Sequence, residues 1–410
     1  MKVLQINAVY KKMSTGRTAS EMHEYMLANG VESYVASPDL CGLTYNSFKI
    51  SNKLDMKAHG FMSRLTGLQG YFSGFSTYRL LRYIDSVEPD IIHLRNLHGN
   101  YINVKMLLKY IAKKDIATVV TLHDCWFFTG KCCHYLEDNC EKWKTTCGKC
   151  PALKKHNNSW FFDRSKKMQN DKLNLFSKIK KLAIVGVSEW VTEEAKQSVI
   201  LKNAFLFEKI YNWIDFNVFK PVNSDLRKKL NLEDKFVIVS VASTWNESKG
   251  LSHIVRLSEK LSDDVRIVLI GNVDKKMLNT DKILSVGMVN SVKELVEYYS
   301  MADCCISCSL QETFGKTVAE ALACGTPSVV YNSTALPELI GENCGFVIEP
   351  ADIDEMASKI NLIKEQGKSQ FSSSCIEYAE KNFNMVDNIE SYISLYKGLF
   401  KINRGIKNED

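Results

Sequence analysis

Two glutamates bracket a short helical pattern in the C-terminal half of the chain. Glu312 precedes the segment Thr-Phe-Gly-Lys-Thr-Val-Ala, and Glu320 follows it. The pattern predicts a helix that begins near residue 314 and ends at Gly325, because a glycine followed closely by Pro327 is a stop signal. The N–H groups at a helix start have no partner inside the helix and carry the positive end of its dipole, which suits a phosphate. A carboxylate, an amide cradle and a second carboxylate therefore match the sugar, the diphosphate and the ribose of a nucleotide-sugar.

The predicted amide cradle consists of Phe314, Gly315 and Lys316, with Ser309 or Thr313 as the helix cap. The alternative is that the two glutamates are only helix-start charges, which the helix dipole stabilises by about 0.3–1 kcal/mol each. Carboxylates that accept hydrogen bonds from ligand hydroxyls contribute more, roughly 1.5–3 kcal/mol per bond. The cost of removing either carboxylate therefore separates the two interpretations.

The chain has 410 residues, which is more than one hydrophobic core usually supports, so two domains are expected. No apolar run approaches the roughly 18 residues that can span a bilayer. The apolar stretch at the start is too short for a signal peptide and is typical of a buried strand. We therefore expect a cytoplasmic protein.

Apolar runs alternate with helical patterns along most of the chain. This alternation predicts an α/β fold made of parallel sheets with helices on both faces. It restarts after residue 215, so two doubly wound, Rossmann-like domains are expected, an N-terminal one at 1–212 and a second at 213–385. A final aromatic-rich helix within 386–410 could dock back on the first domain. The predicted strands are 3–6, 32–36, 91–94, 117–122, 183–187 and 205–210 in the first domain, and 236–241, 265–270, 304–307, 328–331 and 345–348 in the second.

Several residues that can do chemistry follow the predicted strands. Ligands of open α/β sheets bind beyond the carboxyl ends of the strands, so these residues are candidates for one site. They are Gly16 and Arg17 in the loop after the first strand, His93 and His98 around the end of the third, His123 and Asp124 after the strand at 117–122, Lys249 after the first strand of the second domain, and Glu312 after the strand at 304–307.

Charge is divided unevenly between the two halves. Residues 1–210 hold 31 Lys and Arg against 19 Asp and Glu, whereas residues 211–410 hold 22 against 28. Between residues 154 and 181, lysines and arginines are interleaved with Trp160, Phe161 and Phe162. Such a stretch could lie on an anionic membrane surface or face an anionic acceptor, and the alternative is a solvated helix face. Peripheral membrane association is therefore expected.

An insert at 130–151 is rich in cysteine. The chain has 13 cysteines and no predicted secretion signal, which favours reduced thiols or metal ligands over a disulfide framework. Cys147 and Cys150 have the spacing of a zinc knuckle, and Cys132 with Cys140 could complete four sulfur ligands. A structural zinc would stiffen an irregular loop, but unligated thiols and disulfides are the alternatives.

With these residues in place, the chain resembles the glycosyltransferase family 4 enzymes, and among them the bacterial capsule and colanic-acid type transferases. The resemblance extends over essentially the whole chain, and the segment from Glu312 to Glu320 with Ala-Cys-Gly-Thr-Pro after it is its most specific part. The other points of similarity are Ser14-Thr-Gly-Arg17, His93-Leu-Arg-Asn-Leu-His98-Gly, Thr121-Leu-His-Asp124, the cysteine insert and Ser248-Lys-Gly250.

This resemblance implies a GT-B fold, in which two domains face a central cleft. It also implies transfer of a sugar, with retention and no obligatory metal, from a UDP- or GDP-sugar. The acceptor would be a glycan or a polyprenyl-diphosphate-linked oligosaccharide used for bacterial surface polysaccharide such as capsule or lipopolysaccharide, made at the inner face of the plasma membrane. The implied roles are His123 near the transferred sugar, Glu312 at its hydroxyls, Glu320 at the ribose, Lys249, the helix amides and Gly16 at the diphosphate, and Arg17, His93, His98 and Asp124 on the acceptor side.

One position departs from the family pattern. The family usually has an arginine about five residues before the lysine, but the segment from Val241 to Lys249 contains none. Arg17 or Lys316 could supply that charge, or backbone amides could hold more of the diphosphate.

The sequence leaves two alternative functions: a sugar-nucleotide epimerase of the same fold, and a zinc-knuckle nucleic-acid-binding protein. The second leaves Glu312 and Glu320 unexplained, and the acidic second half would repel phosphate backbones. No nucleic-acid partner is therefore expected.

Overall fold

The computed structural model describes residues 1–40, 45–278, 280–289 and 291–403. The chain divides into two compact units. Unit 1 comprises Met1–Ile210 together with the chain from Ile389 onward, and unit 2 comprises Tyr211–Asn388. Each unit is built around one parallel β-sheet.

The sheet of unit 1 has seven parallel strands in the order β3-β2-β1-β4-β5-β6-β7. The central strands β4, β5 and β6 are buried along their whole length, as expected for a parallel sheet covered on both faces. The strands are β1 (Lys2–Ile6), β2 (Glu32–Ser37), β3 (Ser47–Lys49), β4 (Ile91–Leu94), β5 (Ala117–Leu122), β6 (Leu182–Gly186) and β7 (Leu206–Lys209).

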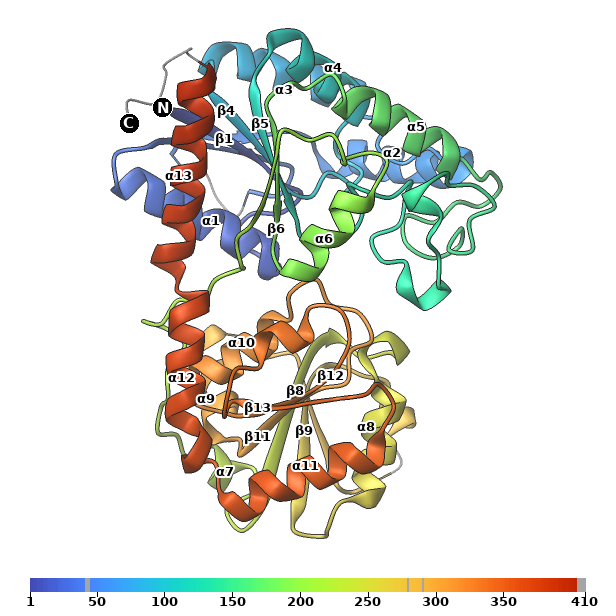
Figure 1. Cartoon of the computed structure of the whole chain (residues 1–410). Coiled ribbons are helices and arrows are strands. Elements are labelled where there is room, and N and C mark those ends of the chain that lie inside the picture. Colours follow the sequence, from blue (N-terminus) through green and yellow to red (C-terminus); the bar gives the residue numbers. More distant parts are fainter. Residues whose placement is uncertain (41–44, 279, 290, 404–410) are drawn as a thin grey trace. The chain divides into compact units, whose positions relative to one another are not determined.

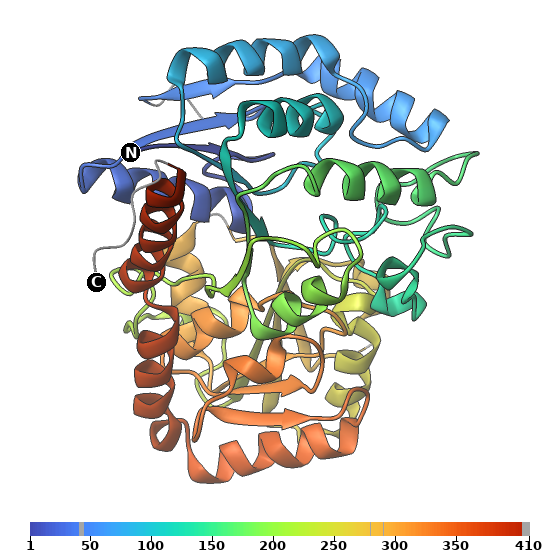
Figure 2. The ribbon, with the colours of Figure 1, turned by 45° about the horizontal axis from the view of Figure 1, so that its top comes forward.

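Helices cover both faces of this sheet. Helices α3, α4 and α5 pack in sequence over one face, and α1 lies over the other (Figures 1 and 2). The α-helices are α1 (Met13–Ala28), α2 (Lys53–Thr66), α3 (Gly74–Val87), α4 (Val104–Lys114), α5 (Ser165–Phe176) and α6 (Glu189–Gln197), and the 3-10 turns are η1 (Leu136–Asp138) and η2 (Lys142–Lys144).

The last helix, α13 (Met385–Asn403), joins the core of unit 1 from Ile389 onward. The Tyr396 hydroxyl lies 2.6 Å from Nδ1 of His93 on β4, and the Tyr392 hydroxyl lies 2.9 Å from the Thr121 hydroxyl on β5. These contacts are buried, so the C-terminal helix is part of this hydrophobic core. Residues 404–410 of the predicted C-terminal segment lie outside the described residues.

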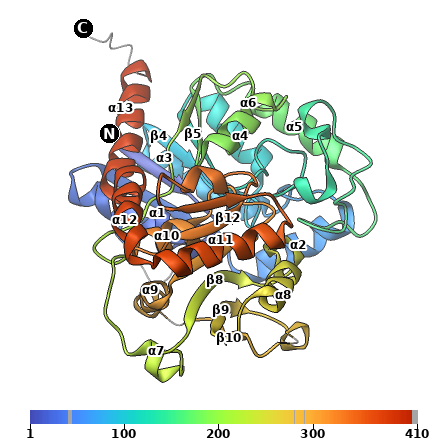
Figure 3. The same cartoon turned by 60° about the horizontal axis from the view of Figure 1, so that its bottom comes forward.

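Unit 2 contains a six-stranded parallel sheet in the order β10-β9-β8-β11-β12-β13. Helix α8 packs against α11, and α10 packs against α9 and α12 (Figure 3). The strands are β8 (Phe236–Thr244), β9 (Val265–Asn272), β10 (Ile283–Gly287), β11 (Cys304–Ser307), β12 (Ser328–Tyr331) and β13 (Gly345–Ile348). The helices are α7 (Leu226–Lys229), α8 (Leu251–Lys260), α9 (Val292–Met301), α10 (Lys316–Ala323), α11 (Ile353–Gln366) and α12 (Ser369–Phe383), with 3-10 turns η3 (Glu247–Lys249), η4 (Lys275–Met277) and η5 (Leu336–Leu339).

The predicted fold class, two doubly wound parallel sheets, is confirmed. One local prediction is wrong: Gly16 and Arg17 lie in helix α1, which begins at Met13, and not in a loop before it. The start was hard to recognise because Lys12 precedes the helix without a side-chain cap. In the part of the chain that the structure describes, no helix is both long and apolar enough to cross a membrane.

Candidate functional site

Lys249 and Glu312 form an ion pair at the carboxyl end of the unit 2 sheet. Lys249 ends the turn η3, which follows β8, and Glu312 lies between β11 and α10. The Lys249 Nζ donates to Glu312 Oε1 at 2.5 Å and to the Ser309 hydroxyl at 3.4 Å. The two charged side chains remain 32% and 24% exposed, so both stay within reach of a ligand. The structure therefore brings together the predicted phosphate cation and the predicted sugar carboxylate.

Helix α10 begins next to this pair, at Lys316, and its N-cap is Gly315. Neither Ser309 nor Thr313 caps the helix, which corrects the sequence-based expectation. Gly315 has a φ of 94°, and a Cβ there would lie 2.9 Å from the side chains of two leucines of η5. A glycine is therefore needed at this position for both its backbone conformation and its close packing.

By the geometry of an α-helix, the N–H groups of Gly315, Lys316 and Thr317 lie at the start of α10 and point along its axis out of the N-terminal end. The cradle is thus displaced by one residue from the predicted set, which began at Phe314. The Phe314 side chain is buried and packs at 5.4 Å, between ring centroids, against Phe383. It anchors the loop before the helix, so only its backbone is placed to meet a ligand.

Glu320 lies in the second turn of α10 and is only 3% exposed. The buried hydroxyl of Tyr299, on α9, donates to Glu320 Oε2 at 3.0 Å. Glu320 is therefore not a solvated helix-start charge. Its carboxylate either supports the packing of α9 against α10 or combines that contact with ligand binding.

In unit 1, His123 follows β5 and is contacted by a buried arginine. Arg95 follows β4, and its Nη1 donates to the Thr18 hydroxyl at 3.1 Å and lies 3.3 Å from His123 Nε2. Because a guanidinium has no acceptor, Nε2 of His123 accepts this bond and the imidazole proton sits on Nδ1. Sequence patterns did not identify Arg95, although a charged residue directly after a short, mainly apolar strand was an available signal.

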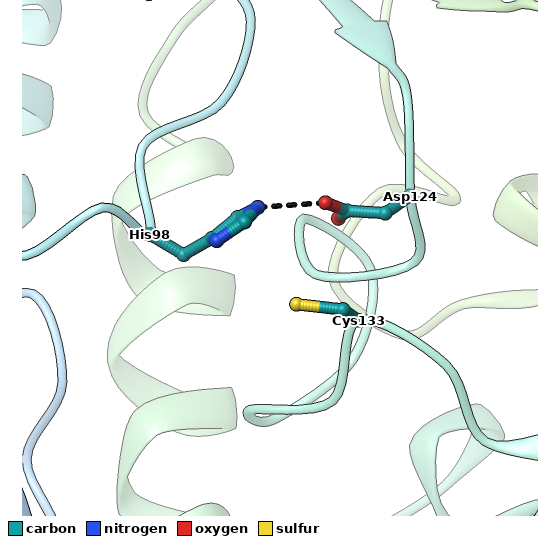
Figure 4. A group of neighbouring side chains, drawn as sticks. All are labelled: His98, Asp124 and Cys133. Carbon is teal, nitrogen blue, oxygen red and sulfur yellow. Dashed lines mark hydrogen bonds and ion pairs between the residues drawn. The ribbon is translucent and has the colours of Figure 1, made fainter. Parts of the chain in front are cut away.

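His98 and Asp124 form a hydrogen-bonded pair at the same end of the sheet. Nε2 of His98 donates to Asp124 Oδ2 at 2.6 Å, and Figure 4 shows the two side chains facing each other. Asp124 also accepts bonds from the Asn96 side chain and from the backbone N–H of Trp126. Burial alone lowers the pKa of His98, but the charge and hydrogen bond of Asp124 outweigh it and raise that pKa. Burial likewise opposes ionisation of Asp124, yet His98 and the other donors lower its pKa to about 2.

The Cys133 thiol completes this cluster (Figure 4). One ligand atom each of His98, Asp124 and Cys133 lies within 4.8 Å of the others, a spacing that could hold a metal ion. Burial lowers the pKa of Lys172 to about 7, although Cys133 and Asp124 favour its charged form, which would oppose a second cation there. The short bond between His98 and Asp124 also occupies both groups, so we treat the cluster as a hydrogen-bonded dyad.

The three remaining residues predicted for the site are buried, closely packed or paired with a nearby side chain. His93 is fully buried, with Nε2 bonded to the Thr121 hydroxyl and Nδ1 to the Tyr396 hydroxyl, so it serves the core and we leave it out of the proposed site. A Cβ at Gly16 would lie 3.2 Å from the backbone of the β1–α1 loop, which indicates close packing. Arg17 pairs with Glu21 at 3.7 Å.

The comparisons with known proteins assign a domain to unit 2. Residues 222–382 match the family model described as "Glycosyl transferases group 1", and this range contains Lys249, Glu312 and Glu320. Unit 2 carries a glycosyltransferase group 1 domain.

The whole chain is similar to a protein of Escherichia coli (strain K12) named "Putative colanic acid biosynthesis glycosyl transferase WcaC". The two are 22% identical over 419 residues, which cover 97% of this chain and 100% of the relative. Two solved structures have a similar fold. Sucrose-phosphate synthase (tll1590) from Thermosynechococcus elongatus has a TM-score of 0.71 at 15% identity, covering 98% of this chain and 100% of that one. Anabaena Alr3699/HepE in complex with UDP and glucose has a TM-score of 0.66 at 16% identity, covering 97% and 100%. The predicted GT-B fold is thereby confirmed.

The pair of His98 and Asp124 gives stability a definite pH dependence. Since the folded pKa of His98 lies above its ordinary 6.5, the pair stabilises the fold fully below about pH 6.5 and loses this contribution as the pH rises through the raised value. We expect the melting temperature of His98→Gln to lie furthest below that of the unaltered protein near pH 6, and the gap to shrink by pH 9, as measured by circular dichroism.

The matched control is His253→Gln, because burial lowers the pKa of His253. The stability linked to that histidine is lost as the pH falls, so its gap should not shrink toward high pH. A gap for His98→Gln that stays constant or widens between pH 6 and pH 9 would contradict the ion pair.

Proposed function

We propose that the chain is a retaining glycosyltransferase that moves a sugar from a nucleotide diphosphate donor onto a glycan or lipid-linked oligosaccharide acceptor in bacterial surface polysaccharide synthesis. The observation that carries the proposal is the ion pair of Lys249 with Glu312 beside the start of α10, inside the glycosyltransferase group 1 domain. WcaC is named for colanic acid biosynthesis and is similar to this chain over nearly its whole length. This similarity supports an acceptor that belongs to bacterial surface polysaccharide synthesis.

The donor diphosphate would bind at the start of α10. As the bond to the sugar breaks, negative charge develops on the departing diphosphate, and fixed donors must stabilise it if no metal does. The amides of Gly315, Lys316 and Thr317 and the ammonium of Lys249 supply such donors. Glu312 both orients Lys249 and presents a carboxylate to the hydroxyls of the donor sugar. HepE, which has a similar fold, was solved with UDP and glucose, and this supports a uridine or similar nucleotide donor.

Glu320 would accept hydrogen bonds from the ribose hydroxyls while keeping its bond to Tyr299 on Oε2. A carboxylate has two oxygens with two lone pairs each, so it can accept several hydrogen bonds at once. Its fixed position in α10 would set the distance between ribose and diphosphate.

In unit 1 we assign His123 to the donor sugar and the pair of His98 and Asp124 to the acceptor. Arg95 donates to Nε2 of His123 and so fixes the orientation of the imidazole that we place beside the donor sugar. The arginine missing before Lys249 would be replaced by the helix amides together with Lys316. Arg17 is less suited, because Glu21 already pairs with it.

An exposed aromatic surface supports peripheral membrane association of unit 1. It consists of Phe61, Trp160, Phe161 and Phe162, whose rings follow one another at centroid distances of 5.7, 6.4 and 6.3 Å. Phe161 is 66% exposed, and the Arg164 guanidinium lies 5.4 Å from the Phe162 ring. Aromatic rings beside cations fit the headgroup level of an anionic bilayer, so we propose that this surface contacts the inner face of the plasma membrane.

The proposed reaction is tested with EDTA present. We expect a UDP- or GDP-sugar to raise the melting temperature, and the purified protein to transfer the sugar to a lipid-linked acceptor with retained anomeric configuration, read by NMR of the product. Inversion would contradict retention, and strict dependence on added Mg²⁺ would contradict metal-free departure of the diphosphate. Epimerised nucleotide-sugar without transfer would favour an epimerase, and salt-sensitive nucleic-acid binding without turnover would favour the other alternative.

Glu320→Ala should weaken donor binding by about 10- to 150-fold, since one charge-assisted bond of roughly 1.5–3 kcal/mol is lost. Donor affinity is measured by calorimetry on the folded variant. The matched control is Tyr299→Phe, which removes the internal partner of Glu320 but keeps the carboxylate. It should retain donor affinity within about threefold. Equal losses in the two variants would make Glu320 a packing residue and remove the ribose assignment.

Loss of the exposed aromatic rings should release the protein from lipid. We expect the double variant Phe161→Ala/Phe162→Ala to sediment with phosphatidylglycerol vesicles at least about tenfold less than the unaltered protein, because each ring buries apolar surface in the bilayer. Phe205→Ala, at a 54% exposed phenylalanine outside the aromatic surface, is the matched control and should sediment normally. Equal binding of all three proteins, or equal binding to neutral phosphatidylcholine vesicles, would contradict the proposal.

A further inference from the structure

The cysteine insert is the least regular part of unit 1. Its residues, 130–151, contain two three-residue 3-10 turns, η1 and η2, and no other helix or strand. The aromatic rings beside it form a small cluster, in which Trp143 lies 5.0 Å from Tyr135 and 5.1 Å from Phe128, between ring centroids. Because few backbone groups of the insert are paired in helices or strands, other interactions must hold the loop in place.

Four of the five insert cysteines line one small pocket. Cys132, Cys140, Cys147 and Cys150 come from separate stretches of the insert and meet around a cavity of about 20 Å³. A cavity of roughly 10–15 Å³ holds one water molecule, so this one has room for a single ion. The pocket is also lined by Thr129, Lys131, Tyr135, Lys142, Trp143, Gly148, Pro151 and Ser165.

Contacts around these sulfurs resemble those of metal-bound cysteines. The side chains of Cys132 and Cys150 hydrogen-bond to each other across the pocket. The backbone N–H groups of Gly130 and Ala152 donate to the sulfurs of Cys147 and Cys150. Donors of this kind stabilise negative charge on sulfur, and the thiolate is the form that binds a metal.

The pocket lining includes one buried lysine and one buried indole N–H. Lys131 is only 2% exposed, and its Nζ donates to the carbonyls of Ala152 and Leu153 at 3.2 and 3.0 Å. The indole N–H of Trp143 is buried without a hydrogen-bond partner among the described residues. Burying an ammonium or an indole N–H without a counterpart is costly. Thiolates in the pocket would give both groups a negative partner.

We propose that the insert binds one Zn²⁺ through the four sulfurs of Cys132, Cys140, Cys147 and Cys150. Tetrahedral sites of four thiolates are typical of structural zinc. Each thiol releases its proton on binding, and the resulting excess of negative charge is offset by Lys131 and Lys142. The Lys142 Nζ donates to the carbonyls of Gly148 and Lys149, inside the turn between Cys147 and Cys150, so it reinforces the knuckle.

Metal binding must draw the sulfurs closer than the structure has them. Zinc–sulfur bonds of about 2.3 Å require all four sulfurs within roughly 4 Å of one another. In the described residues, groups of three ligand atoms within 4.8 Å do not include these cysteines. The four cysteines share one pocket, and the loop that carries them contains only two 3-10 turns, so the closure requires no change in an α-helix or strand.

Cys133 provides the internal contrast. It directly follows Cys132, but its sulfur lies beside His98 and Asp124 (Figure 4) and accepts a bond from the Asn157 side chain at 3.7 Å. It does not line the pocket of the other four cysteines. Two neighbouring cysteines of the same loop therefore have different predicted roles.

Elemental analysis of the full chain, purified with a reductant and without added chelator, tests the site. We expect about one zinc per chain in the unaltered protein and in Cys133→Ser, and a loss of at least tenfold in Cys132→Ser and Cys150→Ser. Substitution with Co²⁺ should give the sulfur-to-cobalt charge-transfer absorption of a tetrahedral thiolate site, and only in the proteins that retain zinc. This readout does not depend on transferase activity, so it stands apart from the proposed reaction.

Each other outcome overturns the proposal. A chain without stoichiometric metal whose thiols all react with an alkylating reagent would show free cysteines. A mass deficit that a reductant restores would show a disulfide between Cys132 and Cys150. Equal loss of zinc from Cys133→Ser and Cys132→Ser would indicate that the metal lies in the cluster of His98, Asp124 and Cys133. Loss of zinc from His98→Gln would confirm that location and overturn the proposal.

Discussion

Parallel strands end at one edge of their sheet, and this constraint places the polar groups of each unit. In unit 2, β8 and β11 are neighbours, so the loops that follow them deliver Lys249 and Glu312 to one point although 63 residues separate them. In unit 1, β4 and β5 are neighbours, and the segments after them deliver His98 and Asp124 in the same way. The sheets themselves supply no chemical group, but their strand order decides which loops can meet.

In the proposed function, the ion pair at the start of α10 would meet two requirements of sugar transfer from a nucleotide. A cation must face the phosphates, and it must be held without being buried so deeply that it loses its charge. Glu312 holds Lys249 by direct contact, while both side chains stay partly exposed. Gly315 then lets the backbone turn into α10 against the leucines of η5, which fixes the amides relative to the pair. These groups depend on one another, because the same short loop carries Glu312 and the helix start.

The sequence predicts the buried strands best and the tertiary partners least. The bounds predicted for β4, β5, β11, β12 and β13 match the structure, and the first four are buried strands that contain a mainly apolar run. The half-exposed strands β3 and β10 lack such a run and were missed. Glu312 and Lys249 were found from local patterns, whereas Arg95 and Tyr299 could not be assigned. Their partners, His123 and Glu320, lie 28 and 21 residues away, and only the fold brings them together.

The contribution of α13 to the core of unit 1 has a consequence for the order in which the protein folds during synthesis. Unit 2 is continuous in sequence and can complete its core as soon as it leaves the ribosome, as domains generally fold as units. Unit 1 is made first but lacks Tyr392 and Tyr396, the partners of Thr121 and His93, until α13 has been translated. Until then the core of the N-terminal unit is incomplete, so the unit that is made first cannot be the first to finish folding.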